Sequence, residues 1–267
     1  MSLRTTIKKL PLLPEICRSA RQAARYLRRR WTHYRLKGQN PEAVFTGIYR
    51  RNGWRGDDSV SGTGSDLLQT RTVSAELPAL FEEFGVHSML DIPCGDFHWM
   101  RLVDRRGVDY IGADIVREIA ERNNREFAGA HVRFQQLDLI RGPLPKADLL
   151  FCRDCLVHLS FTDIFSSLRS ACASGAEYLL TTTFPGQTSN RDISTGEWRR
   201  INLQLAPFGF PQPLKTVNEH CTEGDGEYAD KSLGLWRMND IRILLARRPA
   251  TRERLSLRTE TCRTLPS

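Results

Sequence analysis

Four apolar runs that each close on a carboxylate constrain the fold of this chain more than any other feature. They are Ser88–Asp91, Tyr110–Asp114, Val132–Asp138 and Ala147–Asp154, with room for a helix between most of them. This layout predicts a parallel sheet, because parallel neighbours need long crossover connections. The carboxyl ends of such strands meet at one edge, where open α/β sheets bind their ligands. One acid at each strand end suits a ligand rich in hydroxyls and amines, such as a nucleoside.

Patterns on either side extend this sheet. Residues 160–173 have the periodicity of a helix, and residues 177–183 form a fifth run that is rich in β-branched residues. Residues 214–219 and 231–238 are typical of two further strands that complete the sheet, here called the closing strands. Residues 77–84 have the pattern of a helix that leads into the first strand. The predicted fold class is therefore α/β, a doubly wound, mostly parallel seven-stranded sheet with an N-terminal extension of helix and loop.

The net charge of +8 is concentrated near the N-terminus. Residues 1–40 hold eleven Lys or Arg and one acid, Glu15, whereas residues 41–267 hold 28 basic and 30 acidic side chains, a net charge of −2. The body of the protein is thus close to neutral. Nucleic acid is disfavoured as a partner, because nucleic-acid-binding domains usually carry a clustered basic surface.

Residues 15–37 have the pattern of an amphipathic helix, with apolar residues every three or four positions and arginines on another face. One interpretation is a solvated helix packed on the domain by its apolar stripe. A second is a cationic helix on an anionic membrane, which would give peripheral membrane contact through residues 15–37. A transit peptide or a nucleic-acid-binding arm is a third.

These observations divide the chain into four parts. We expect a basic arm over residues 1–40, a cap or lid over 41–85, the sheet domain over 86–248 and a loose polar tail over 249–267. The seven cysteines have no framework spacing, and no signal peptide or run of about 18 apolar residues is present. The expected location is therefore the cytoplasm, with the inner membrane face as the alternative that the arm suggests.

Two loop-rich segments flank the strands. The segment Ser61–Ser65, of sequence Ser-Gly-Thr-Gly-Ser, offers backbone amides and hydroxyls near aromatic residues. It suits either a surface connector or a lid over a ligand. Residues 184–213 form a long irregular segment, and such segments in compact domains are often functional. From position and composition we expect an acceptor pocket that comprises Trp54, Asn190, Asp192, Trp198 and Arg199.

The order of these elements resembles that of the class I S-adenosylmethionine-dependent methyltransferases, over about residues 89–238. Asp91–Met100 and Phe151–Ser160 are similar to segments of a bacterial subgroup of that superfamily, as are Ser61–Ser65 and Asp230–Trp236. The superfamily's first motif usually has two or three glycines, whereas this chain keeps only Gly95. The resemblance implies S-adenosyl-L-methionine as the cofactor. It also implies methyl transfer to oxygen or nitrogen of a small-molecule or saccharide-like acceptor.

The resemblance also assigns the strand-end acids to parts of the cofactor. Asp91 would accept hydrogen bonds from the methionine ammonium, Asp114 from the ribose hydroxyls and Asp138 from the adenine amino group. Leu139 would lie against the adenine ring, and Gly95 would let the backbone approach the methionine moiety closely. Neighbours of these residues complete the expected cofactor site, namely Pro93, Cys94, Asp96, Ile115, Cys152 and Arg153.

Asp154 and His158 are the candidate catalytic residues, because the segment after the fourth strand borders the sulfonium in this superfamily. Transfer to a hydroxyl or a protonated amine needs a base, and histidine titrates near neutrality. Asp154 would orient His158 or the acceptor, and the two residues share a face if a helical turn starts at Asp154. The opposing interpretation is a capping aspartate and a packed histidine.

Cys152, Cys155 and His158 also have a spacing typical of metal ligands, with Cys94 as a conceivable fourth. Only three of them are local, so we expect no metal, and thiols that line a nucleoside pocket explain them more simply. A nicotinamide enzyme would need Gly-x-Gly-x-x-Gly after the first strand, which this chain lacks. The remaining alternatives are a non-catalytic scaffold that binds an adenosyl cofactor at a membrane surface and an RNA methyltransferase.

Overall fold

The computed structural model describes residues 34–56 and 58–247. The amphipathic helix expected over residues 15–37 lies outside the described residues except for its end, where residues 34–36 are helical. The tail expected over residues 249–267 lies outside them entirely. Within the two described ranges, no helix is long and apolar enough to cross a membrane.

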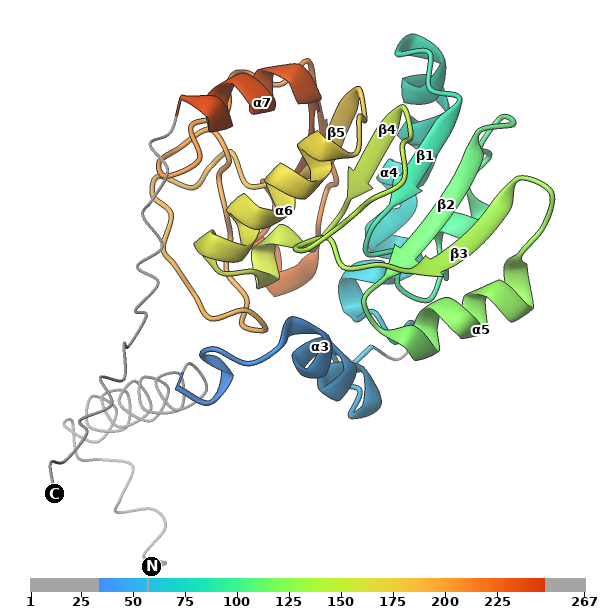
Figure 1. Ribbon diagram of the computed structural model, residues 1–267, viewed down its shortest axis with the longest axis horizontal. Coiled ribbons are helices and arrows are strands. Elements are labelled where there is room, and N and C mark those ends of the chain that lie inside the picture. Colours follow the sequence, from blue (N-terminus) through green and yellow to red (C-terminus); the bar gives the residue numbers. More distant parts are fainter. Residues whose placement is uncertain (1–33, 57, 248–267) are drawn as a thin grey trace, which may run out of the picture.

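Seven strands form one sheet in the order β3-β2-β1-β4-β5-β7-β6 (Figure 1). Strands β1 to β5 run parallel, and β7 pairs antiparallel with both β5 and β6. The predicted fold class is confirmed, and each predicted strand is present with its bounds shifted by two residues or fewer. The strands are β1 (Ser88–Asp91), β2 (Asp109–Asp114), β3 (Val132–Gln136), β4 (Leu149–Cys152), β5 (Tyr178–Thr183), β6 (Lys215–Asn218) and β7 (Ser232–Arg237).

The helices agree with the sequence pattern only in part. Helix α6 (Phe161–Ala173) is where it was predicted, and α5 (Arg117–Phe127) fills the space between β2 and β3. Helix α4 (Leu67–Glu83) begins well before residue 77, where the prediction placed its start. Two further helices, which the sequence pattern did not predict, are α3 (Pro41–Arg50) and α7 (Met238–Ala246).

Helix α3 begins at the first residue of the region 41–85, which was predicted as a cap or lid. Asn40 accepts a hydrogen bond from the backbone N–H of Glu42, and Pro41 occupies the first turn. Both residues favour a helix start, because the cap satisfies a free N–H and proline has the required φ. The sequence at Asn40 and Pro41 therefore accounts for the start of α3.

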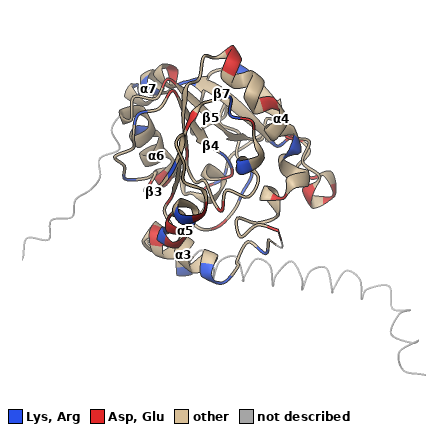
Figure 2. Ribbon diagram, turned by 90° about the vertical axis from the view of Figure 1, so that its right-hand side faces the viewer, with Lys and Arg blue, Asp and Glu red and all other residues tan. Residues whose placement is uncertain are grey.

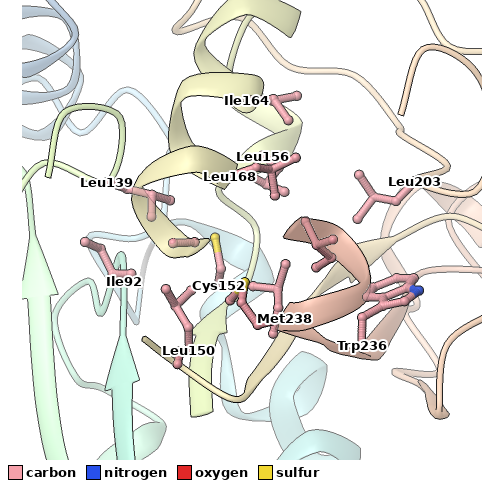
Figure 3. Packing of buried hydrophobic residues seen from close by; sticks show 14 of the residues in the cluster. Ile92, Leu139, Leu150, Cys152, Leu156, Ile164, Leu168, Leu203, Trp236 and Met238 are labelled. Carbon is pink, nitrogen blue, oxygen red and sulfur yellow. The ribbon is translucent and has the colours of Figure 1, made fainter. Parts of the chain in front are cut away.

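Two apolar layers cover the faces of the sheet, with α6 and α7 together on one side (Figure 1). Along β1 successive side chains alternate, so that Met89 packs in the layer of α4 and Leu90 in the layer of α6 and α7. Figure 3 shows part of the second layer, where Cys152 of β4 lies near Met238 of α7. Burial of each such side chain stabilises the fold by about 1.5–3 kcal/mol.

Acidic and basic residues are interspersed along the described elements (Figure 2). Exposed ion pairs such as Arg106 with Glu82, 3.0 Å apart, are typical of this surface. Pairs of this kind contribute little stability, because water screens both charges. The mixture of signs follows from the near-neutral composition of residues 41–267.

Candidate active site

A cavity lies at the carboxyl ends of β1, β2 and β4. It is lined by the turn after β1, the ends of β2 and β4, the segment after β3, and parts of the N-terminal region that include Phe45 and Trp54. We refer to it as the first cavity. Ten of the residues predicted to hold the cofactor line it, namely Asp91, Pro93, Cys94, Gly95, Asp96, Asp114, Ile115, Asp138, Leu139 and Arg153.

The eleventh predicted residue, Cys152, does not line the first cavity, which corrects the prediction. Its side chain is 1% exposed and lies in the apolar layer under α6, near Leu150 and Met238 (Figure 3). Alternation along β4 turns this side chain into the core. Cys155 is the cysteine of this segment that lines the cavity. In the described ranges, no group of three or more His, Cys, Asp or Glu side chains is arranged to hold a metal ion.

Asp91 ends β1 and is 3% exposed. The hydroxyl of Tyr110 donates a 2.6 Å hydrogen bond to its Oδ2. Burial raises the pKa of Asp91 from 3.8 to about 7, although the bond from Tyr110 and the charge of Arg153 act in the opposite direction. The carboxyl is therefore one that a nearby cation would stabilise in its ionised form.

Asp114 ends β2 and holds the turn that follows β1. Its Oδ2 accepts a hydrogen bond from the N–H of Gly95 (3.2 Å), and its Oδ1 accepts one from the N–H of Val116 (2.9 Å). Burial raises the pKa of Asp114 from 3.8 to about 6, against the effect of these hydrogen bonds. On the other side of the turn, Asn123 of α5 donates to the carbonyl of Gly95 at 2.7 Å.

The segment predicted as a lid is bound directly to this turn. The carboxylate of Asp96 accepts from the hydroxyl of Ser59 (2.9 Å) and from the N–H of Val60 (3.0 Å), and the N–H of Asp96 donates to Oγ of Ser61 (3.2 Å). Gly95 has a φ of +54°, and a Cβ on it would collide with Oγ of Ser61. Glycine is therefore required here by the backbone and by the close approach of Ser61.

Asp138 follows β3 and closes a tight turn. Its Oδ1 accepts hydrogen bonds from the N–H groups of Ile140 (2.8 Å) and Arg141 (3.3 Å). Leu137, Asp138 and Leu139 line the first cavity side by side. The segment after β3 thus places one acid between two apolar side chains in the wall of the first cavity.

Asp154 follows β4 with a φ of +53° and forms ion pairs with two cations. Its Oδ2 lies 2.6 Å from Nζ of Lys231 and 3.3 Å from Nη1 of Arg153. Burial opposes ionisation, but the charges of Lys231 and Arg153 outweigh it and lower the pKa of Asp154 from 3.8 to about 2. Asp154 is therefore ionised at neutral pH and is a poor proton acceptor. The helical turn expected to start at Asp154 starts instead at Leu156, as a single 3₁₀ turn.

Sequence reasoning missed the partners that hold this segment. Glu219, at the end of β6, accepts from Nη2 of Arg153 at 2.6 Å and lies 3.5 Å from Nζ of Lys231, beside the start of β7. All three side chains are buried, and buried charges are tolerated when they are paired in this way. The available signal was the position of Glu219 directly after one closing strand and of Lys231 directly before the other. Arg153 also donates to the carbonyl of Gly64 at 2.8 Å, which connects β4 to the N-terminal region.

His158 is held in one tautomer. Its Nδ1 lies 2.9 Å from the backbone carbonyl of Glu197. A carbonyl only accepts hydrogen bonds, so Nδ1 carries the proton and Nε2 keeps a free lone pair. Burial lowers the pKa of His158, which keeps the ring neutral at neutral pH. The ring contacts Trp54 edge-on, with centroids 6.3 Å apart.

A second cavity adjoins the first and shares Trp54, Ser61, Asp154 and His158 with it. Of the predicted acceptor residues, Trp54 and Trp198 line this second cavity. Its remaining walls come from the N-terminal loop, the segment after β5 and the connection between β6 and β7. They consist of Gly53, Gly62, Thr63, Gly64, Phe184, Glu223, Tyr228 and Lys231.

The other three predicted acceptor residues line neither cavity. Arg199 is 1% exposed and donates to the carbonyls of Leu156 (2.7 Å) and Leu159 (2.8 Å). Asn190 donates to backbone carbonyls of the same long loop, and Asp192 accepts from the N–H of the first residue of α6. A long irregular segment must satisfy its backbone groups without strands or helices, and these side chains serve that purpose.

Comparisons with known proteins agree with this architecture. No protein-family model matches the chain, and no curated protein matches it. Human N-acetylserotonin methyltransferase in complex with SAM is a similar solved structure, with a TM-score of 0.51 and 18% identity over 75% of this chain and 60% of that one. The chain thus spans less than two thirds of the human enzyme.

A second similar structure is the 1,6-didemethyltoxoflavin-N1-methyltransferase of Burkholderia thailandensis with bound 1,6-didemethyltoxoflavin and S-adenosylhomocysteine. It has a TM-score of 0.50 and 18% identity over 73% of this chain and 86% of that one. At these identities the likeness shows the fold alone. The chain has the class I methyltransferase fold.

Proposed function

We propose that this protein is an S-adenosylmethionine-dependent methyltransferase that acts on oxygen or nitrogen of a small-molecule or saccharide-like acceptor. One observation carries the proposal. Asp91, Asp114 and Asp138 end or follow three adjacent strands and line one cavity together with the turn at Gly95. That cavity shares His158 with a second cavity that has room for another molecule.

The residues of the first cavity fit the parts of the cofactor. Asp91 is a buried carboxyl with a pKa of about 7, and it suits the methionine ammonium, whose charge would favour the carboxylate. Each oxygen of Asp114 accepts one backbone N–H and retains a lone pair for a ribose hydroxyl. Asp138 and its two leucine neighbours suit the adenine amino group and ring.

S-adenosylmethionine, when bound, supplies a methyl group on a positively charged sulfur. The acceptor provides the lone pair for the new bond and must lose a proton. In this proposal His158 takes that proton at Nε2, since Nδ1 already donates to Glu197 and the ring is neutral. Asp154, kept ionised by Lys231, orients the acceptor and stabilises the imidazolium that forms.

Calorimetric titration with S-adenosylmethionine, S-adenosylhomocysteine and NAD tests the cofactor. Micromolar binding of the first two and none of NAD would support the proposal. Absence of binding by either adenosyl compound would overturn it. Release of S-adenosylhomocysteine in the presence of an acceptor then distinguishes an enzyme from a scaffold that only binds the cofactor.

The location of the protein is a separate proposal. We propose a cytoplasmic protein, with peripheral contact to the inner membrane face through residues 15–37 as the role of the basic arm. The charge of residues 1–40 supports this contact. Anionic vesicles should co-sediment the intact protein but not a version that starts at Gln39, and equal sedimentation of both would contradict the idea.

A further inference from the structure

Gly64 leaves a small polar gap in the wall of the second cavity. A Cβ at this position would lie 3.3 Å from Oδ2 of Asp154, 3.5 Å from Oε2 of Glu223 and 3.6 Å from Nζ of Lys231. None of these distances requires a neighbour to move far. Gly64 is also not among the glycines with a positive φ, so the backbone does not demand glycine here. The missing side chain therefore leaves these three charged atoms uncovered on the cavity wall beside Gly64.

The signs of these charges restrict what the gap can hold. A carboxylate or phosphate would be repelled by Asp154 and Glu223, whereas an ammonium would be attracted by these two carboxylates but repelled by Lys231. A neutral hydroxyl fits, because it donates to a carboxylate oxygen and accepts from an ammonium at the same time. The gap is thus matched to a hydroxyl.

Aromatic rings lie in the same cavity. Trp198 and Tyr228 are in contact, with centroids 5.1 Å apart, and Phe184 packs edge-on against both. The Trp198 side chain is 39% exposed and lines the second cavity. Aromatic surface suits the C–H face of a saturated ring, and the neighbouring carboxylates suit the hydroxyls on its rim.

From this arrangement we infer that the second cavity takes a neutral, hydroxyl-rich acceptor of the sugar class, with one hydroxyl in the gap at Gly64. The inference rests on the proposed function, because it assigns the second cavity to the acceptor. Another hydroxyl of the same molecule would be methylated at His158, which borders both cavities. The oxygen of this acceptor hydroxyl forms the bond to the methyl carbon, and the carbon–sulfur bond breaks with its electron pair on sulfur. The hydroxyl proton passes to Nε2 of His158.

Two variants and two matched controls test the gap. Gly64→Ala fills it with a methyl group, while Gly129→Ala adds the same group where nothing lies within 4 Å and φ is not positive. Glu223→Gln removes one carboxylate but keeps an oxygen that can accept from the hydroxyl of Thr63. Asp225→Asn removes a charge from the same loop outside the cavity lining.

The probes are three neutral methyl glycosides, those of glucose, galactose and mannose, together with catechol, phenethylamine and glucose 6-phosphate. Saturation-transfer NMR measures their binding without a cofactor, and calorimetry with S-adenosylhomocysteine measures the first cavity separately. We expect a neutral glycoside to bind best. Gly64→Ala and Glu223→Gln should each weaken that binding about tenfold, the effect of one lost hydrogen bond to a charged group. The controls should match the wild type, and all four variants should retain S-adenosylhomocysteine binding.

Preference for catechol, phenethylamine or the phosphate would overturn the inference, as would wild-type glycoside affinity in Gly64→Ala. S-adenosylhomocysteine binding without glycoside binding would also overturn it, yet leave the proposed function standing. The protein could instead bind a glycoside, lose that binding in Gly64→Ala, and bind no adenosyl compound. This result would overturn the proposed function and support the sugar site.

Discussion

The hydroxyl of Tyr110 on β2 donates a 2.6 Å hydrogen bond to Oδ2 of Asp91 at the end of β1, and both side chains are buried. This bond favours the ionised carboxyl, but burial has the larger effect and raises the pKa of Asp91 to about 7. An acid in this condition destabilises the folded protein at alkaline pH unless a cation is bound beside it. That cost is typical of a residue kept for binding rather than for stability.

The affinity for S-adenosylmethionine should depend on pH through Asp91. The ammonium needs the carboxylate form, so affinity should rise about tenfold between pH 5.5 and 7 as the proton leaves. Calorimetry in buffers of different ionisation enthalpy should show proton release on binding below pH 7. An affinity that is constant over this range would contradict the assignment of Asp91 to the ammonium.

Asp91→Asn should stabilise the protein without ligand at pH 8. Because the folded pKa of about 7 lies above the unfolded value near 3.8, the stability that Asp91 contributes is greatest at low pH and is lost as the pH rises through about 7. The amide has no charge to bury and can still accept from Tyr110. We expect a melting temperature a few degrees higher at pH 8, little change at pH 4 and much weaker cofactor binding.

Asp114→Ala should weaken S-adenosylmethionine binding by about 1.5–3 kcal/mol, the scale of lost hydrogen bonds to a charged group. Asp109→Ala, at the exposed start of the same strand, is the control and should bind as the wild type does. A melting curve is needed beside each titration, because Asp114 also holds the N–H groups of Gly95 and Val116. Wild-type affinity in a folded Asp114→Ala protein would remove this acid from the site.

Gly95→Ala should be more destabilising than a positive φ alone explains. The new methyl group would collide with Oγ of Ser61, whereas Gly107→Ala adds a methyl group at a φ of +79° with nothing within 4 Å. Backbone strain costs about 1–3 kcal/mol in both variants. The additional loss of unfolding free energy in Gly95→Ala, beyond that in Gly107→Ala, should become smaller when Ser61→Gly is combined with it. Denaturant unfolding of the wild type, the two single variants and the double variant measures this difference. Equal losses in Gly95→Ala and Gly107→Ala would mean that Ser61 moves away at no cost.

The sequence was sufficient for the sheet because each strand is a short apolar run with a definite end. It was insufficient for several helices. Helix α4 follows a glycine-rich segment and contains Pro78 in its interior, where a proline usually marks a helix boundary. Helix α7 follows β7 without an intervening turn, so no glycine, proline or capping side chain marks its start at Met238.

The cofactor-site residues were predictable for a topological reason. A strand-end acid such as Asp114 has its place fixed by the order of the strands, whatever its neighbours are. The acceptor-site residues have no such constraint. Arg199 and Asp192 bond to backbone groups that no pattern identifies, and Glu223 reaches the second cavity only because distant segments meet there.

Arg199 should act on the site through the turn that carries His158. Its guanidinium joins the carbonyls of Leu156 and Leu159, on either side of that residue. The single ammonium in Arg199→Lys cannot reproduce both planar contacts. We expect the free energy of unfolding to fall by about 1–3 kcal/mol, whereas Arg169→Lys on the exposed face of α6 should change it little. If Arg199→Lys were as stable as the wild type, the carbonyl of either Leu156 or Leu159 would not need its hydrogen bond from Arg199.

His158→Gln should separate proton transfer from binding. Glutamine can still donate to the carbonyl of Glu197 but cannot take a proton, so kcat for methyl transfer to a hydroxyl should fall about 10²- to 10⁴-fold. Adenosyl binding should stay at the wild-type level. Because burial lowers the pKa of His158, the wild-type kcat at saturating S-adenosylmethionine should be constant near neutral pH. It should fall only at pH values below the usual pKa range of histidine, where the ring becomes protonated. That acidic decline should be absent in His158→Gln, and its persistence would assign the titration to another group, such as Asp91.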